Sequence, residues 1–425
     1  MGDHPLFRSS QLRRHVLVRM RHITNTSLRA LVCGFAVALL FSELVHANQG
    51  SLTRPSVNLH GAFFLTPDTG WVVGQLGKVF YTTDGGKSWQ EQASKTNLLL
   101  TAVDFTDQNN GWAVGERGII FHTDDGGKSW KAQTSNVTYP LFDVDFIDNQ
   151  KGWAVGHWGT VLFTDDGGQH WQERSLSTAL TGRGQIDPAA FTDIKDPTTG
   201  EIIAKAGQLL SREIIAKITQ SGINDARVRE DIVLNSVFFL DATHGWIVGE
   251  QGRVVRTEDG GQTWESVTLP RPPKQAGSDG NEELMSDEEL EAFGALTPPP
   301  SLYGLFYISP QQGWVVGQEG AIARTQDGGR QWEFQPSGSQ EALYDIGVKG
   351  ETGWIVGDKG AVLVSTSSGT QWEKRELGLE YRLSWLRRLA ITPSDNSYFV
   401  GADGLVLTSG KSPDQGVWVR PVHEK

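Results

Sequence analysis

Cysteine is nearly absent from this chain, because its 425 residues include only Cys33. Six arginines and one acidic residue over residues 1–29 precede an apolar run at 30–41, and VHA at 45–47 offers small residues for a cleavage site. This order predicts a secretory signal over residues 1–47 and an exported, periplasmic protein. The apolar run is shorter than the ~20 residues of a spanning helix, which favours a cleaved signal over a membrane anchor. Without Cys33 the exported chain would have no disulfide, so core packing alone must stabilise it.

Positive charge is also in deficit, with 38 Lys and Arg against 50 Asp and Glu and a net charge of −12. An acidic chain is a poor partner for nucleic acid and for anionic lipid in general. The histidines are scattered singly, and no glycine-rich phosphate loop opens a helix. We therefore predict no metal site, no cofactor, no small-molecule substrate and no catalytic residues.

Glycine and tryptophan, by contrast, are abundant and periodic, with 50 and 15 copies. The sequence GWVVG at 70–74 is followed by TTDGGKSW at 82–89, and the same order returns with Trp112 and Trp153, each 41 residues after the last. Later copies begin at Trp246, Trp314 and Trp354, and a decayed seventh begins at Tyr398. Within a copy, apolar residues alternate over four short strands separated by turns. The repeats predict an all-β fold, a seven-bladed β-propeller of four-stranded antiparallel blades over residues 48–425.

One aspartate recurs before a Gly-Gly pair in most copies. A carboxylate there can accept backbone N–H bonds within a hairpin turn, and glycine supplies the positive φ. The tryptophan that ends the motif is large enough to fill the gap between blades. One aspartate per blade would lie far from the next, which favours a structural role over a shared metal or catalytic role. These structural residues are Asp84, Asp125, Asp166, Asp259 and Asp327.

The motif S/T-x-D-x-G-x-S/T-W is the Asp-box, or BNR repeat, of sialidases and related propellers. Together with G-W-x-V-G-x-x-G it resembles the photosystem II stability/assembly factor-like family, over roughly residues 56–420. The resemblance, which extends to bacterial members, implies a non-catalytic exported scaffold that is associated with a membrane, in the periplasm or in a compartment like the thylakoid lumen. Such a scaffold would bind a membrane protein or complex and assist its assembly.

The family carries a basic patch of arginines before the Asp-box threonine. Here only Arg256 and Arg324 stand at that position, and Arg253 and Arg117 could add charge nearby. We predict these four as partner-binding residues. The alternative is that they are ordinary solvated strand ends with packed aliphatic stems.

A second hypothesis is a carbohydrate-binding or glycoside-hydrolase-like Asp-box propeller. Sialidase-like chemistry needs converging arginines and a tyrosine nucleophile paired with a glutamate. Arg54 lacks the surrounding pattern of the first such arginine, and no tyrosine is evidently paired with a glutamate. The sequence therefore favours the scaffold.

Two insertions break the repeat. Residues 175–232, between blades three and four, predict a small ββαβ insert with strands at 191–194 and 201–204, a helix at 212–220 capped by Ser211, and an extended piece at 226–232. The insert is either a docking surface or a lid packed on the propeller. Residues 270–300 are flanked by prolines and rich in Asp and Glu, which predicts a mobile acidic loop.

Overall fold

A computed structural model describes residues 57–174, 176, 189–223, 226, 228–229, 231–269, 299–376, 384–392, 396–409 and 417–419. Residues 54–425 form one compact unit. The predicted signal at 1–47 lies outside the described residues, as does the predicted acidic loop at 270–300 apart from its last two residues. No described helix is long and apolar enough to cross a membrane.

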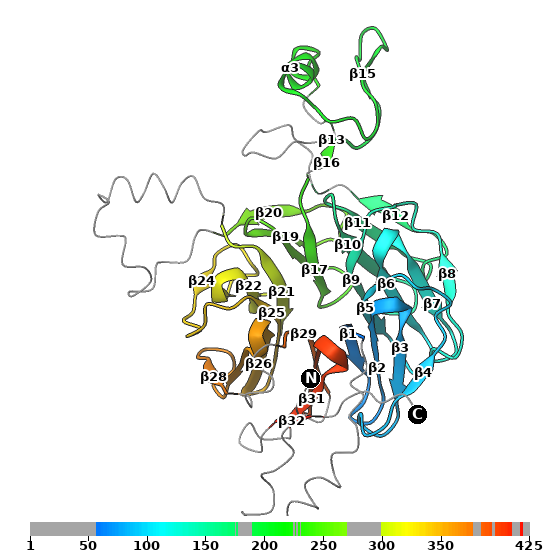
Figure 1. The fold of residues 1–425 in the computed structure, drawn as a ribbon. Coiled ribbons are helices and arrows are strands. Elements are labelled where there is room, and N and C mark those ends of the chain that lie inside the picture. The colour runs from blue at the N-terminus through cyan, green and yellow to red at the C-terminus, as the bar shows by residue number, and fades with distance from the viewer. Residues whose placement is uncertain are drawn as a thin grey trace, which may run out of the picture. The chain divides into compact units, whose positions relative to one another are not determined.

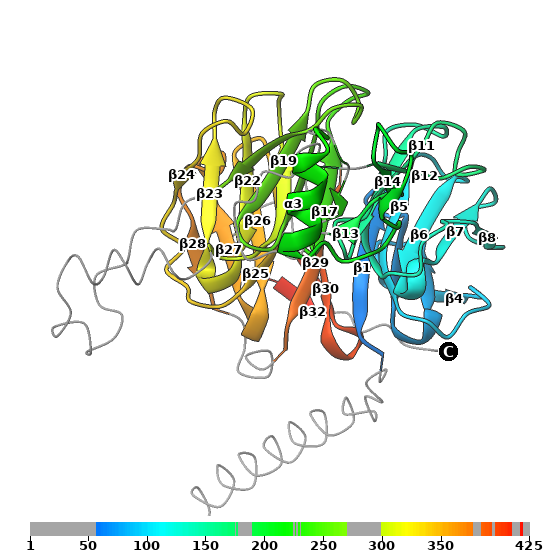
Figure 2. The ribbon, with the colours of Figure 1, turned by 90° about the horizontal axis from the view of Figure 1, so that it is seen from above.

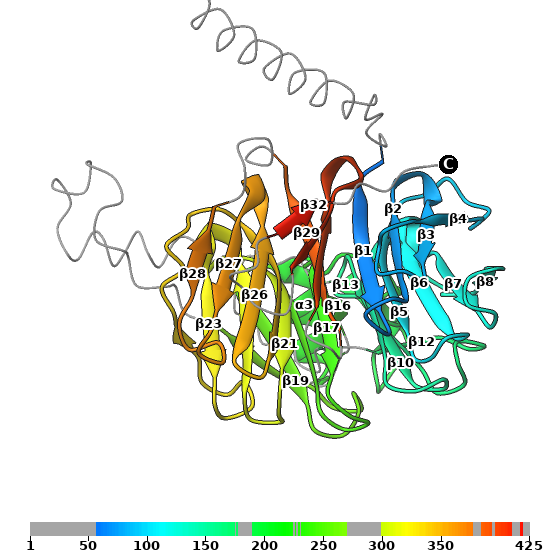
Figure 3. The same ribbon diagram turned by 90° about the horizontal axis from the view of Figure 1, so that it is seen from below.

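The described residues form seven four-stranded antiparallel sheets, each built from strands consecutive in the chain (Figure 1). The first strands of successive blades contact one another in order, and β29 contacts β1, which closes the ring. Figure 2 and Figure 3 show the ring from its side, with the strands of neighbouring blades running next to one another. The predicted seven-bladed β-propeller is thereby confirmed.

The first three blades occupy the N-terminal part of the ring. Blade 1 comprises β1 (Leu59–Phe64), β2 (Gly70–Gly74), β3 (Val79–Thr82) and β4 (Gln90–Gln92). Blade 2 comprises β5 (Leu100–Phe105), β6 (Gly111–Gly115), β7 (Ile120–Thr123) and β8 (Lys131–Gln133). Blade 3 comprises β9 (Leu141–Phe146), β10 (Gly152–Gly156), β11 (Val161–Thr164) and β12 (Gln172–Arg174).

The last four blades follow the insert. Blade 4 comprises β17 (Leu234–Phe239), β18 (Gly245–Gly249), β19 (Arg253–Thr257) and β20 (Glu265–Thr268). Blade 5 comprises β21 (Leu302–Tyr307), β22 (Gly313–Gly317), β23 (Ile322–Thr325) and β24 (Glu333–Phe334). Blade 6 comprises β25 (Leu343–Lys349), β26 (Thr352–Gly357), β27 (Val362–Ser365) and β28 (Glu373–Arg375). Blade 7 comprises β29 (Leu386–Ile391), β30 (Ser397–Gly401), β31 (Val406–Ser409) and β32 (Val417–Val419).

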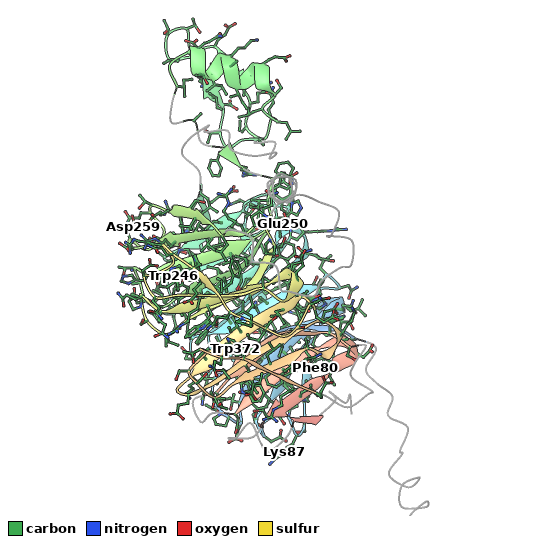
Figure 4. The ribbon with its side chains drawn as sticks, turned by 90° about the vertical axis from the view of Figure 1, so that its left-hand side faces the viewer. Phe80, Lys87, Trp246, Glu250, Asp259 and Trp372 are labelled. Atoms are coloured by element: carbon green, nitrogen blue, oxygen red, sulfur yellow. The ribbon has the colours of Figure 1, made fainter. Side chains whose placement is uncertain are left out.

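The strand register gives the ring two distinct faces. The first strand of a blade begins beside the turn that joins its second and third strands, as Leu59 pairs with Gly74. We call this end the mouth face, and the opposite end, which carries the Asp-box turns, the Asp-box face. Figure 4 shows the two ends of blade 4, with Glu250 in a mouth-face turn and Asp259 in an Asp-box turn. Because each fourth strand ends at the mouth face, both insertions leave the ring there.

The blades are joined by a repeated aromatic contact. Trp112 of blade 2 stacks on Phe146 of blade 3, with ring centres 3.6 Å apart. Its indole N–H also donates to the backbone oxygen of Gly167 in blade 3. Trp171, the Asp-box tryptophan of blade 3, meets the other edge of Phe146. Tyr398 stacks on Phe64 at 3.7 Å and closes the ring in the same way.

Glycine is required at the mouth-face turns by close backbone approach. A Cβ on Gly115 would lie 2.0 Å from the backbone oxygen of Leu99, and one on Gly156 would lie 2.1 Å from that of Pro140. The backbone there is extended, so the constraint is space rather than φ. This explains why the second glycine of G-W-x-V-G recurs.

The described part of the insert contains one helix, α3 (Arg212–Gln220), over the residues that the sequence predicts. The Ser211 hydroxyl accepts a hydrogen bond from the backbone N–H of Ile214, as an N-cap does. Ile218 on α3 is fully buried in a small separate core. The predicted hairpin forms from β14 (Ile194–Lys195) and β15 (Ile202–Ala204), which are shorter than expected. The sequence did not predict β13 (Ala189–Ala190), which pairs with β16 (Val228–Arg229).

Candidate functional site at the channel mouth

Each Asp-box carboxylate accepts hydrogen bonds from groups of its own turn. Asp84 accepts hydrogen bonds from the backbone N–H of Ser88 at 2.9 Å, the Ser88 hydroxyl at 2.6 Å and the Thr82 hydroxyl at 2.9 Å. Desolvation opposes ionisation, but these hydrogen bonds lower the pKa of Asp84 to about 2. The same bonds from a hydroxyl two residues earlier and a backbone N–H four residues later are made to Asp125, Asp166, Asp259 and Asp327.

The arginines predicted to bind a partner are divided between the two faces. Arg256 is 6% exposed and lies near the Asp-box face, paired with Glu258 and Glu265. Arg324, at the same position in blade 5, lies over the ring of Trp314 at 5.6 Å.

The other two predicted arginines lie at the mouth face. Arg253 donates to the Ser266 hydroxyl at 2.8 Å. Arg117 is exposed in a tight turn with φ of 57°. The four side chains therefore form no single patch, and their role in binding stays a prediction.

The structure instead brings together seven side chains that the sequence reasoning missed. Each is the second residue of the first strand of its blade, and together they ring the mouth of the central channel. They line a cavity of about 300 Å³ with help from neighbouring residues. One signal in the sequence could have located them, because each follows a buried leucine that recurs in every blade. The seven are His60, Thr101, Phe142, Asn235, Tyr303, Tyr344 and Arg387.

Below this ring the channel holds buried carboxylates that bind the next blade. Asp345 accepts a hydrogen bond from the backbone N–H of Leu389 at 2.8 Å, and Asp104 accepts one from that of Phe146 at 2.7 Å. First strands are edge strands, so their channel-facing N–H groups lack a strand partner. The carboxylates supply that partner across the gap between blades.

Asp143 and Asp145 make the corresponding bonds to blade 4. Asp143 accepts from the backbone N–H of Val237 at 3.1 Å, and Asp145 accepts from that of Phe239 at 2.6 Å. Asp143 also pairs with Arg388, the one cation among these acids in the described channel.

Burial dominates the electrostatics of these acids. It raises the pKa of Asp345 to about 6, against the opposing effect of Arg388. Burial likewise raises the pKa values of Asp104 and Asp145. For Arg388, burial acts to lower the pKa, but Asp143 and Asp345 hold it above its ordinary value. No group of three or more His, Cys, Asp or Glu among the described residues could hold a metal ion.

Comparison with known proteins gives the fold and the family. A curated relative, the photosystem II assembly lipoprotein Ycf48 of Synechococcus sp. (strain CC9902), is 28% identical over 96 residues, which are 23% of this chain and 22% of that protein. The match thus spans about a fifth of the relative. A solved structure of YCF48 bound to a D1 peptide has a TM-score of 0.54 and 17% identity, covering 84% of this chain and 93% of that chain.

A second solved structure, the GH74 xyloglucanase from Xanthomonas campestris, also has a TM-score of 0.54, with 14% identity over 87% of this chain and 55% of that chain. Likeness to either structure at such low identity shows the fold alone. The family described as "Photosynthesis system II assembly factor YCF48" matches residues 48–140, 131–193, 217–279 and 295–409, which together are most of the chain. The chain therefore belongs to the family of the photosynthesis system II assembly factor YCF48.

Proposed function

We propose that this protein is a non-catalytic, exported scaffold that binds a segment of a membrane protein and assists the assembly of its complex. The family membership supports an assembly role, and one solved member holds a peptide of D1. The basic and apolar residues of the predicted signal support export.

The observation that carries the proposal is the pocket at the channel mouth. Every blade contributes one residue to its lining, and both insertions leave the ring at the same face. The mouth face also presents apolar side chains: Leu76 is 61% exposed, and Trp158 lies beside Tyr139. An exposed apolar surface around a pocket is typical of a protein-binding site.

The carbohydrate hypothesis gains less support from this pocket. Most glycosidases use a pair of carboxylates at the scissile bond. Among the described residues that line the mouth there is no Asp or Glu, and the acids deeper in the channel accept hydrogen bonds from backbone N–H groups. The likeness to the GH74 enzyme is a likeness of fold alone.

Cross-linked co-purification tests the proposal. The tagged chain would be cross-linked in its native membranes, purified and analysed by mass spectrometry, beside a Tyr303→Ala/Tyr344→Ala variant. Gln311→Ala on the Asp-box face is the matched control. We expect one membrane complex with the unaltered chain and with the control, and much less with the mouth variant. Recovery of nothing above background, or of a complex indifferent to the mouth residues, would contradict the proposal.

A further inference from the structure

The seven mouth residues differ in whether their polar groups are already used. Thr101 donates its hydroxyl to the backbone oxygen of Leu141 at 2.7 Å, and Asn235 donates its amide to that of Leu302 at 2.8 Å. Both bonds join neighbouring blades. These two side chains are therefore part of the ring's structure and leave little for a ligand.

Arg387 is different, because no carboxylate among the described residues pairs with it. Its guanidinium carbon lies 4.8 Å from the ring centre of Tyr344 and 5.9 Å from that of Tyr303. The adjacent Arg388 is bonded to Asp143 and lies near Asp345. Of two neighbouring arginines, one is thus neutralised within the channel and the other is held between tyrosines at its mouth.

The surroundings of Arg387 increase its need for an anion. Burial, together with the charge of Arg388, lowers its pKa. A guanidinium stays protonated in proteins, so the cation remains, and no ion pair among the described residues offsets its desolvation cost. A planar fork of N–H donors is suited to a carboxylate, which it can bind through two parallel hydrogen bonds.

On the blade-1 side of Arg387 the cavity wall is aromatic and holds a second buried polar group. The His60 ring lies 5.1 Å from that of Trp385, and its buried Nε2 has no hydrogen-bond partner in the part of the chain that the structure describes. Burial lowers the pKa of His60 to about 4, so the ring is neutral at neutral pH and can still donate or accept one hydrogen bond. A cavity of about 300 Å³ is at the small end of ligand pockets, and it suits one or two amino-acid side chains.

We propose that the channel mouth is a carboxylate-binding site, in which Arg387 binds an acidic group of a partner peptide while Tyr303, Tyr344 and Trp385 enclose the adjoining apolar part. This inference rests on the proposed function and names the chemistry that its pocket recognises. The carboxylate comes either from an Asp or Glu side chain or from a chain terminus. Because Arg387 would hold one end of the ligand group and the aromatic rings the other, such a site would select the orientation of the peptide as well as its sequence.

Titration calorimetry with three synthetic peptides tests the chemistry. The probes are N-acetyl-Ala-Leu-Gly with a free carboxylate, the same peptide with a C-terminal amide, and N-acetyl-Ala-Glu-Gly-amide. We expect at least one of the two carboxylate peptides to bind, and the neutral amide of the first to bind at least tenfold more weakly than the tighter of the two. Whichever carboxylate peptide binds identifies the source of the group. Binding of the neutral amide as tight as that of the tighter carboxylate peptide, or no binding of either carboxylate peptide, would overturn the proposal.

Variants locate the site. Arg387→Gln should weaken binding of the carboxylate peptide by about tenfold or more, because it removes a charge-assisted hydrogen bond. Lys95→Gln removes an exposed cation of the same face outside the pocket and should leave binding unchanged. Equal losses of peptide affinity in the two variants would mean that the positive charge of the whole face attracts the peptide, which would refute the proposal. Displacement of the peptide by a neutral xyloglucan oligosaccharide would indicate a sugar site and would refute it as well.

The acid–amide comparison on the unaltered chain stands even if Arg387→Gln fails to fold. The failure of this inference also remains distinct from failure of the proposed function. If the membrane complex still co-purifies with Arg387→Gln, the scaffold function holds without a carboxylate site.

Discussion

Asp345 provides a direct test of how the channel is held together. The residue is 6% exposed, and its carboxylate accepts hydrogen bonds from the backbone N–H groups of Ile346 at 2.9 Å and Leu389 at 2.8 Å. Burial raises its pKa from 3.8 to about 6. Since the folded pKa lies above the unfolded one, folding favours the protonated form.

The sign of the pH dependence follows from this shift. The stabilisation from protonated Asp345 is fully present below about pH 4 and is lost as the pH rises through about 6. The difference between the two pKa values corresponds to about 3 kcal/mol in the free energy of unfolding.

Asp345→Asn removes the titration but keeps a side-chain oxygen that can accept from Leu389. Relative to the unaltered protein, we expect this variant to gain about 3 kcal/mol of stability between pH 4 and pH 8, because only the unaltered protein must ionise a buried carboxyl there. Urea unfolding at intervals of one pH unit, compared at equal slope, measures the gain. Asp165→Asn, at an exposed position, is the control. A stability difference that is constant with pH, or that falls as the pH rises, would refute the reasoning.

Two further predictions concern the repeats. Trp112→Phe should cost about 1 kcal/mol, because it keeps the stack on Phe146 and loses the indole bond to Gly167, whereas Trp112→Ala should cost about 3–5 kcal/mol; equal unfolding midpoints for the two variants would contradict this. Asp125→Ala should cost about 1 kcal/mol at neutral pH, because it removes the acceptor of the Ser129 and Thr123 bonds. Those bonds lower the pKa of Asp125 to about 2, so the loss should shrink as the pH falls from about 4 toward 2, and a loss that grows in acid would contradict the assignment.

The parts of the fold that the sequence predicts are those that recur. A glycine such as Gly115 is fixed by backbone approach in every blade, and a tryptophan such as Trp112 stacks on an aromatic ring of the next blade in blades 1 to 4, so both leave a periodic signal. The helix of the insert was predictable for a local reason, since Ser211 caps it. The short strand β13 was missed because its support is distant in the chain: it pairs with β16, about forty residues later, and is bridged to Leu209.

The candidate site escaped prediction for the opposite reason. His60, Tyr303 and Arg387 occupy equivalent positions with unlike residues, so repetition hides them rather than marking them. The sequence also cannot show that acids such as Glu265 neutralise Arg256. The pairing of this charge becomes evident only once β19 and β20 are placed side by side.

Site-specific photo-cross-linking tests most directly the claim that the channel mouth receives a membrane protein. A photoreactive p-benzoylphenylalanine would replace Tyr303 at the mouth or, as a control, Gln311 on the Asp-box face, and cells would be irradiated before membranes are extracted. We expect position 303 to form a defined adduct with one integral membrane protein, through a peptide that contains or adjoins an acidic group, and position 311 to form none. An adduct from position 311 alone, or the same adduct from both positions, would contradict this account of the mouth.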